Sequence, residues 1–357
     1  MIDTIKHEIA NKFKIEGMIK EVKEYGSGLI NNTYLVVTNK NKYIFQIINN
    51  NVFKNPDKLM KNIELVTNYL KIKNGTTIKL IKTDDDKNYL FYENKYYRCY
   101  EMKQNYISYE KIPNLKIALE TGKTIANFQY LLNDFDIKLL DVTIPFFHDL
   151  RHRYIDLIIA FRNSNDILKK NECKKIIKEI IKEYENVMKL PILIERGLIG
   201  KRVCHYDTKL NNFLFSEKDE IKSCLIDLDT VMPGCSLYDY GDNIRNTIVS
   251  VMEDEYEKDV VIDYEKFINI TIGYLSIGKN YLTKKEIENL INGIKVIVIE
   301  LSIRFLTDYL NDNIYFKINC EKHNLYRSIC QLNIYKKIKC EEKKFKKLVD
   351  EVCGRII

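Results

Sequence analysis

The stretch His205-Tyr-Asp207-Thr-Lys-Leu-Asn-Asn212 is polar and sets a histidine, an aspartate and an asparagine at fixed intervals. It is followed by Leu225-Ile-Asp227-Leu-Asp229, in which two apolar residues precede a further aspartate. A single Asp or Asn is more often a turn or cap residue. The complete pattern, H-x-D-x4-N followed by an apolar pair and an Asp, is far more specific and indicates a reactive site.

This spacing suits the transfer of a phosphoryl group, in which a protein mainly positions groups and stabilises charge. One carboxylate receives the proton of the attacking hydroxyl, an amide on the same loop can bind a metal ion, and a second carboxylate holds Mg²⁺ against ATP. Asp207, Asn212 and Asp227 fit these three roles in that order. Few protein ligands are needed, because Mg²⁺ prefers oxygen ligands and keeps several waters.

The regions on either side of this stretch differ in their patterns. The first hundred residues contain strand signals and one segment of helical period, at 56–70. The strand candidates are 32–38, 43–48, 76–82, 88–92 and 95–102. After about residue 103, helical periodicity with abundant Lys and Glu dominates, at 112–133, 148–162, 165–189, 263–277, 284–310 and 324–353. We predict an α+β fold with a β-rich lobe at residues 1–102 and a mainly helical lobe at 103–357.

Composition narrows the class of protein. The chain carries 57 basic and 50 acidic residues, a net charge of +7, and the two signs are interleaved. A nucleic-acid binder would more often cluster its basic residues on one face. The nine cysteines include no C-x-x-C pair, which fits reduced thiols better than disulfides or a zinc site. No uncharged apolar run approaches about 20 residues. We expect a cytoplasmic protein without nucleic-acid or membrane partners.

The polar loop resembles the catalytic loop of aminoglycoside phosphotransferases and their relatives, which share the protein-kinase-like fold. More narrowly, the chain resembles bacterial N-acetylhexosamine 1-kinases, through stretches that run from residue 28 to residue 310. These stretches are Gly28-Leu-Ile-Asn-Asn-Thr-Tyr-Leu-Val36, Val52-Phe-Lys-Asn-Pro56, Ile63-Glu-Leu-Val66, Asp207–Asn212, Ile226-Asp-Leu-Asp-Thr-Val-Met-Pro-Gly234, Leu237-Tyr-Asp-Tyr-Gly-Asp242 and Arg304-Phe-Leu-Thr-Asp-Tyr-Leu310.

The resemblance implies a two-lobed protein-kinase-like fold and ATP-dependent phosphorylation of the anomeric hydroxyl of an N-acetylhexosamine, GlcNAc or GalNAc, with Mg²⁺ as cofactor. It makes Asp207 the catalytic base and Asn212 and Asp227 the metal ligands. His205 is expected to organise the loop, and Lys209 is a candidate for neutralising phosphate charge.

The nucleotide-binding candidates lie in the first lobe. Gly26, Ser27 and Gly28 form a turn whose backbone N–H groups could approach phosphates. Kinase-like folds also expect a lysine on the third strand, paired with a helix glutamate. Here Gln46 takes the strand position and Glu64 is the helix candidate. The lysine is therefore missing or supplied from elsewhere, with Lys54 and Lys58 as candidates.

The acceptor candidates are Asp229, which follows the metal aspartate by two residues, and, from the resemblance, Arg304 and Tyr315. Asp239 and Asp242 are expected to orient the loop or cap a helix. Two alternatives stay open. The chain could phosphorylate another small alcohol, such as an aminoglycoside, homoserine or choline, of which choline would require an aromatic cage. It could also be a catalytically weak nucleotide-binding module, because Gln46 replaces the expected lysine.

Overall fold

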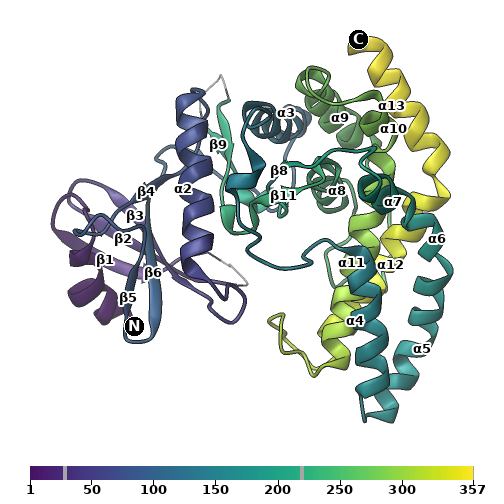
Figure 1. The fold of residues 1–357 in the computed structure, drawn as a ribbon, viewed down its shortest axis with the longest axis horizontal. Helices are drawn as coiled ribbons and strands as arrows, with labels where there is room; N and C mark the ends of the chain where they lie inside the picture. Colours follow the sequence, from purple (N-terminus) through teal and green to yellow (C-terminus); the bar gives the residue numbers. More distant parts are fainter. Residues whose placement is uncertain (27–29, 218–220, 357) are drawn as a thin grey trace. The chain divides into compact units, whose positions relative to one another are not determined.

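The computed structural model describes residues 1–26, 30–217 and 221–356 (Figure 1). The chain forms two compact units. The first combines Met1–Ile107, Asp134–Pro145 and Leu214–Pro233, and the second combines Ser108–Asn133, Phe146–Phe213 and Gly234–Ile357. The predicted boundary at residue 102 lies near the end of the first of these segments.

The first unit is built on an antiparallel sheet with strand order β1-β2-β3-β6-β4, and β5 pairs with β6. The strands are β1 (Ile19–Glu24), β2 (Asn32–Thr38), β3 (Lys42–Ile48), β4 (Lys79–Ile81), β5 (Leu90–Tyr92) and β6 (Lys95–Glu101). In the β3–β6 register, Gln46 lies opposite Arg98. The predicted strands of the β-rich lobe are thus present, and apolar side chains such as Phe45 and Cys99 alternate into its core.

Helical segments cover this sheet core. The N-terminal turns α1 (Ile2–Thr4), η1 (Ile5–Ile9) and η2 (Ala10–Lys12) bury Ile5 and Ile9 against the core. The helix α2 (Pro56–Ile72) begins at Asn55, whose side chain accepts the backbone N–H of Lys58. It carries Asn62, a buried residue that donates to the Val231 carbonyl at 3.0 Å. This bond ties α2 to the segment that follows Asp227.

Later segments of the chain complete the first unit. The strands β7 (Tyr106–Ile107), β9 (Phe213–Ser216) and β10 (Ser223–Leu225) form a small sheet in the order β10-β9-β7. The unit also contains the turns η3 (Ile137–Leu139) and η5 (Leu228–Thr230), and the strand β11 (Met232–Gly234) begins at its last residues.

The second unit is helical, as predicted from the periodicity of residues 103–357. The long helix α11 (Leu290–Leu310) is almost entirely buried and packs against α4, α8 and α12, and α3 packs against α9 (Figure 1). The other elements are α3 (Leu115–Leu131), α4 (Leu150–Asn163), α5 (Ile167–Lys182), α6 (Tyr184–Val187), α7 (Lys189–Glu195), β8 (Arg202–Cys204), η4 (Leu210–Asn212), α8 (Ser236–Thr247), α9 (Tyr264–Gly278), α10 (Lys284–Glu288), α12 (His323–Cys340) and α13 (Glu342–Ile356).

Two observations bear on the compositional expectations. The nine cysteines all lie within the described residues and are free thiols. Among the helices described, none combines the length and the apolar character that crossing a bilayer requires.

Candidate active site

The polar loop of residues 205–212 is held in place by α8. Both carboxylate oxygens of Asp239 accept backbone N–H groups of the loop, from His205 at 3.0 Å and from Tyr206 at 2.8 Å. The Thr208 hydroxyl donates to the Asp239 carbonyl. Tyr206 has a φ of 67°, a left-handed conformation that is unusual for a bulky residue and needs support from its surroundings. The expectation that Asp239 orients the loop is confirmed.

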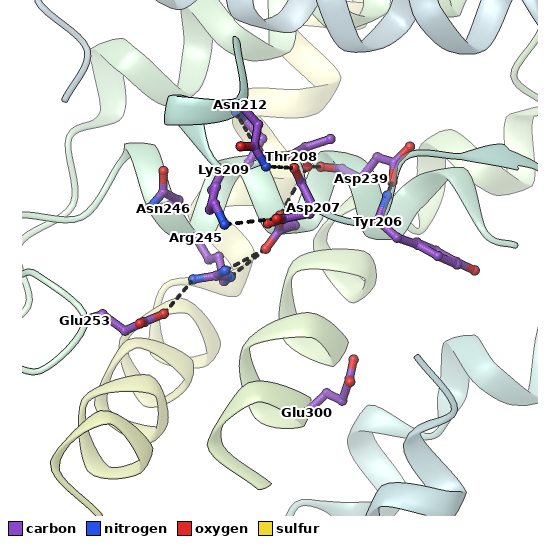
Figure 2. A network of polar contacts seen from close by, with 12 residues as sticks. Tyr206, Asp207, Thr208, Lys209, Asn212, Asp239, Arg245, Asn246, Glu253 and Glu300 are labelled. Atoms are coloured by element: carbon purple, nitrogen blue, oxygen red, sulfur yellow. Dashed lines mark hydrogen bonds and ion pairs between the residues drawn. The ribbon is translucent and has the colours of Figure 1, made fainter. Parts of the chain in front are cut away.

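Asp207 lies at the centre of this loop with its carboxylate partly exposed. Lys209 Nζ lies 2.9 Å from Asp207 Oδ2, and Figure 2 shows the lysine side chain directed at the carboxylate. Burial by itself would raise the pKa of Asp207, but Lys209, His205 and Asn212 together hold that pKa below its usual range. Asp207 is therefore ionised at neutral pH and can accept a proton.

Other side chains fix the backbone around Asp207. His205 Nδ1 accepts the backbone N–H of Asp207 at 3.3 Å, in line with its expected role in organising the loop. Asn212 Nδ2 donates to the Asp207 carbonyl at 2.8 Å, which directs the amide oxygen of Asn212 away from that carbonyl. From α8, Asn243 donates to the Thr208 carbonyl, and Asn246 accepts the Leu210 N–H.

The two asparagines of α8 were not predicted from the sequence. They follow Asp239 at helical spacing, on a helix whose residues from Ser236 to Arg245 are all buried. Asp239, Asn243 and Asn246 recur at intervals of four and three residues, which places them on one side of a helix, and this spacing is the signal that could have found them. Asp242 of the same helix forms an ion pair with Arg245, with 2.7 Å between the nearest atoms.

The acceptor candidates Arg304 and Tyr315 are brought together in the helical unit. The Arg304 guanidinium carbon lies 4.7 Å from the ring centre of Phe147, 5.7 Å from that of Tyr315 and 5.5 Å from that of Phe316. Arg304 Nη1 also lies 3.8 Å from a carboxylate oxygen of Glu300. The result is a cation enclosed on several sides by aromatic rings.

A buried acid–histidine pair connects this cluster with the loop. Glu300 is fully buried, and its Oε2 lies 2.5 Å from His148 Nδ1. His148 Nε2 lies 3.3 Å from the carbonyl of Tyr206, the residue before Asp207. Burial would raise the pKa of Glu300, but His148, Arg304 and Arg153 hold it below its usual value. Sequence patterns gave no signal for His148 or Glu300, because isolated residues of these types are common in helices and loops.

In the first unit, Asp227 and Asp229 lie in very different environments. Asp227 has a φ of 60° and a ψ of 62°, a left-handed conformation at the end of the β10 segment. Asp229 is buried and forms an ion pair with Arg98, which was not among the sequence candidates. Arg98 also binds Gln46 through two hydrogen bonds.

The other residues predicted to bind the nucleotide do not share the contacts of Gln46. Glu64 pairs with Lys82 at 3.0 Å and accepts a hydrogen bond from Asn88. Lys58 lies 3.4 Å from Asp141, and Lys54 is exposed. Gly26 has a φ of 75°, whereas Ser27 and Gly28 lie outside the described residues.

The sequence pattern implies Mg²⁺ at Asn212 and Asp227, and each residue can be tested in its own unit. The Asn212 amide oxygen is directed away from the Asp207 carbonyl, and Asp227 is a carboxylate held in a strained turn. Both supply the oxygen donors that Mg²⁺ prefers. Within residues 1–26, 30–217 and 221–356, no three His, Cys, Asp or Glu side chains gather as a metal site. Each residue, taken in its own unit, offers an oxygen donor of the kind that Mg²⁺ binds alongside waters and phosphate oxygens.

Several solved structures are similar to this chain in architecture. An aminopropanol kinase associated with a microcompartment superposes with a TM-score of 0.64 at 11% identity, covering 96% of this chain and 98% of its own. The chain has a kinase-like fold. An ethanolamine kinase of Plasmodium vivax gives a TM-score of 0.61 at 17% identity, with 94% of this chain and 87% of that chain covered.

A spectinomycin phosphotransferase solved with ADP and spectinomycin gives a TM-score of 0.59 at 14% identity, with coverages of 94% and 92%. These neighbours confirm the predicted α+β class with an antiparallel sheet in the N-terminal part and helices in the C-terminal part. No model of a known protein family matches the chain.

Proposed function

We propose that this protein is an ATP-dependent phosphotransferase that uses the hydroxyl group of a small molecule as acceptor. The observation that carries the proposal is the geometry of Asp207. Its carboxylate is kept ionised by Lys209, on a loop that Asp239 fixes through two backbone N–H groups. The kinases and phosphotransferases among the structural neighbours support the same reaction class.

The reaction follows from the position of this base. As the acceptor oxygen forms its bond to the γ-phosphorus of ATP, Asp207 accepts the hydroxyl proton, and the bond from that phosphorus to ADP breaks. Lys209 remains close enough to Asp207 to offset negative charge as the phosphoryl group passes. Mg²⁺, when bound, neutralises the phosphates, and we propose Asn212 and Asp227 as its protein ligands.

Within this class we propose an N-acetylhexosamine as acceptor, phosphorylated at its anomeric hydroxyl. The resemblance along residues 28–310 supports this assignment, and so does Arg304. Its guanidinium occupies the ring cluster of Phe147, Tyr315 and Phe316, which could otherwise enclose a quaternary amine. A sugar offers hydroxyl and carbonyl oxygens to a cation, so Arg304 and Tyr315 are proposed to contact it.

The second candidate is an amino alcohol, and the names of two structural neighbours favour it. One is an aminopropanol kinase and another is an ethanolamine kinase. Such a substrate would bring a positive charge that Arg304 repels, so it would need a carboxylate elsewhere in the helical unit.

An acceptor screen distinguishes the two candidates. ADP release from Mg·ATP is measured with GlcNAc, GalNAc, aminopropanol, ethanolamine, choline, homoserine and spectinomycin, and the product is identified by phosphorus NMR. Formation of a sugar 1-phosphate is the expected result. Turnover with amino alcohols alone would transfer the assignment to the second candidate. A chain that binds no Mg·ATP in calorimetry would have neither activity.

The catalytic assignment is tested by Asp207→Asn. General base catalysis contributes at least about 100-fold, so turnover should fall by that factor or more. Mg·ADP binding should persist, because the substitution keeps the shape of the side chain. Asp350→Asn, an exposed change on α13, is the matched control and should leave turnover intact. A near-normal kcat for Asp207→Asn would show that Asp207 is not the catalytic base.

A further inference from the structure

The sheet position at which kinase-like folds place a lysine is occupied by Gln46, and the structure shows what Gln46 does. Its side chain oxygen accepts hydrogen bonds from Arg98 Nε at 3.0 Å and Arg98 Nη2 at 2.8 Å. Gln46 Nε2 donates to the Thr33 hydroxyl. Gln46 and Arg98 are direct neighbours in the β3–β6 register. The polar side chain on β3 therefore orients an arginine on the adjacent strand.

The far side of Arg98 faces Asp229. Arg98 Nη1 and Nη2 lie 2.5 and 2.8 Å from the two carboxylate oxygens, the paired geometry that suits a guanidinium and a carboxylate. The exposed fractions of the two side chains are 1% and 4%. Asn31 donates to Asp229 Oδ2 at 2.7 Å, and Thr143 donates to the Asp229 carbonyl at 3.2 Å. Both carboxylate oxygens of Asp229 are thus engaged inside the unit.

These contacts bear on Asp227, two residues earlier. A non-glycine residue in a left-handed conformation is costly and persists where its surroundings hold it. The Arg98–Asp229 pair fastens the turn immediately after Asp227 to strands β3 and β6, and Asn31 fastens it to the start of β2. These anchors hold the backbone turn from which the Asp227 side chain extends.

Direct binding of phosphate by Arg98 is disfavoured by the same geometry. A guanidinium has five N–H donors, and Arg98 directs two hydrogen bonds to Gln46 and two to Asp229. With its side chain 1% exposed, it presents almost no surface to a ligand. Its guanidinium group is paired with the Asp229 carboxylate.

We propose that Arg98 is a positioning residue that replaces the missing strand lysine, by holding Asp229 so that Asp227 is oriented to bind the Mg²⁺ of the Mg·nucleotide complex. This inference rests on the proposed function, and it gives Asp229 a role in the nucleotide side rather than in acceptor binding. Residues that orient a metal ligand from outside typically change metal affinity about 10- to 100-fold when they are replaced.

The test is calorimetric titration with ADP, with and without Mg²⁺, on the full-length protein. The double substitution Arg98→Met with Asp229→Asn removes both buried charges and leaves an amide that can still accept from Asn31. It should weaken Mg·ADP binding about 10- to 100-fold, while binding of ADP in EDTA stays unchanged. The matched control is Lys79→Met with Glu101→Gln, an exposed ion pair of the same sheet, which should change neither titration.

Arg98→Lys keeps the buried charge but cannot bind Gln46 and Asp229 together through a planar fork. We expect it to fold and to require more Mg²⁺ for half-maximal ADP binding than the wild type. Folding of every variant is checked by circular dichroism. If the wild type binds Mg·ADP and the folded variants bind it equally well, the role of Arg98 is overturned although the proposed function stands. If the wild type binds no Mg·ADP, both proposals fail.

Discussion

At the scale of single residues, the ion pair with Lys209 influences the protonation of Asp207. The 2.9 Å contact contributes to the lowered pKa of Asp207, so the base is ionised to lower pH than an isolated aspartate would be. Replacing Lys209 by Met removes that contribution and raises the pKa of Asp207. Because the base works in its ionised form, the acid limb of the activity profile should shift to higher pH. The measurement is kcat/KM against pH.

A control separates this effect from a general loss of positive charge. Lys201→Met changes an exposed lysine at the entry to β8 and should leave the acid limb in place. If Lys209→Met lowers kcat but leaves the acid limb of the pH profile in place, Lys209 acts on the phosphate and not on the pKa of Asp207.

The residues of the site differ in how far the sequence could predict them. Asp207, Lys209 and Asn212 lie within one short loop, so their spacing is visible in the sequence and the structure brings them together. The Arg98–Asp229 contact spans 131 residues, and that of His148 with Glu300 spans 152. Such pairs arise only from the folded arrangement of several elements, and a single sequence carries no local pattern for them.

At the scale of elements, α8 supports the loop and its own position is set by α11. Gly241 of α8 faces Gly293 of α11, and a Cβ built on Gly241 would lie 2.7 Å from the Gly293 carbonyl carbon and oxygen. Gly241→Ala must therefore separate the two helices, and overpacking of this kind destabilises by about 1–3 kcal/mol. The shift also moves Asp239, so kcat should fall together with the free energy of unfolding. Both are measured, by denaturant titration and by ADP release.

Gly354→Ala is the matched control for this substitution. A Cβ at Gly354 meets nothing within 4 Å, so alanine should stabilise α13 by up to about 1 kcal/mol. If Gly241→Ala kept the stability and the kcat of the wild type, the close approach of Gly241 to Gly293 would not be what positions α8.

The helices and strands themselves were accessible to sequence reasoning where apolar residues recur with a clear period. The segments predicted at 112–133 and 148–162 correspond to α3 and α4. The short helix α8 was not predicted from the sequence, because its buried face is largely polar. Asp239, Asn243 and Asn246 bind loop backbone instead of filling an apolar core, so hydrophobic periodicity gives no signal for them.

At the scale of the molecule, the two units are interleaved along the chain. Residues 134–145 and 214–233 return to the unit that begins with residues 1–107. The change from strand to helix patterns near residue 103 was visible in the sequence. The return of two later segments was not, because it depends on hydrogen bonds and burial between residues far apart, such as that of Asn62 with Val231.

This interleaving predicts that a fragment of residues 1–107 does not fold stably. It would keep Arg98 inside the sheet but lose Asp229, and breaking a buried ion pair by removing one partner destabilises by about 3–5 kcal/mol. Asn62 would lose its partners at Asp141 and Val231 as well. Because small domains are stable by only about 5–15 kcal/mol, these losses should leave the fragment largely unfolded. Circular dichroism and amide hydrogen exchange measure this.

The effect of Arg98→Met on stability, compared between the full chain and the fragment, distinguishes the loss of the buried ion pair from other causes of unfolding. In the full chain, Arg98→Met leaves Asp229 buried without its counter-charge and should lower the free energy of unfolding. In the fragment, where Asp229 is absent, the same change removes an unpaired buried cation and should raise stability, seen as increased helix and strand signal. A fragment that folds as well as the full chain, or that loses structure with Arg98→Met, would mean that the sheet does not depend on the Arg98–Asp229 pair. Because both effects come from one side chain in two covalent contexts, differences in length or composition between the proteins cannot imitate the reversal.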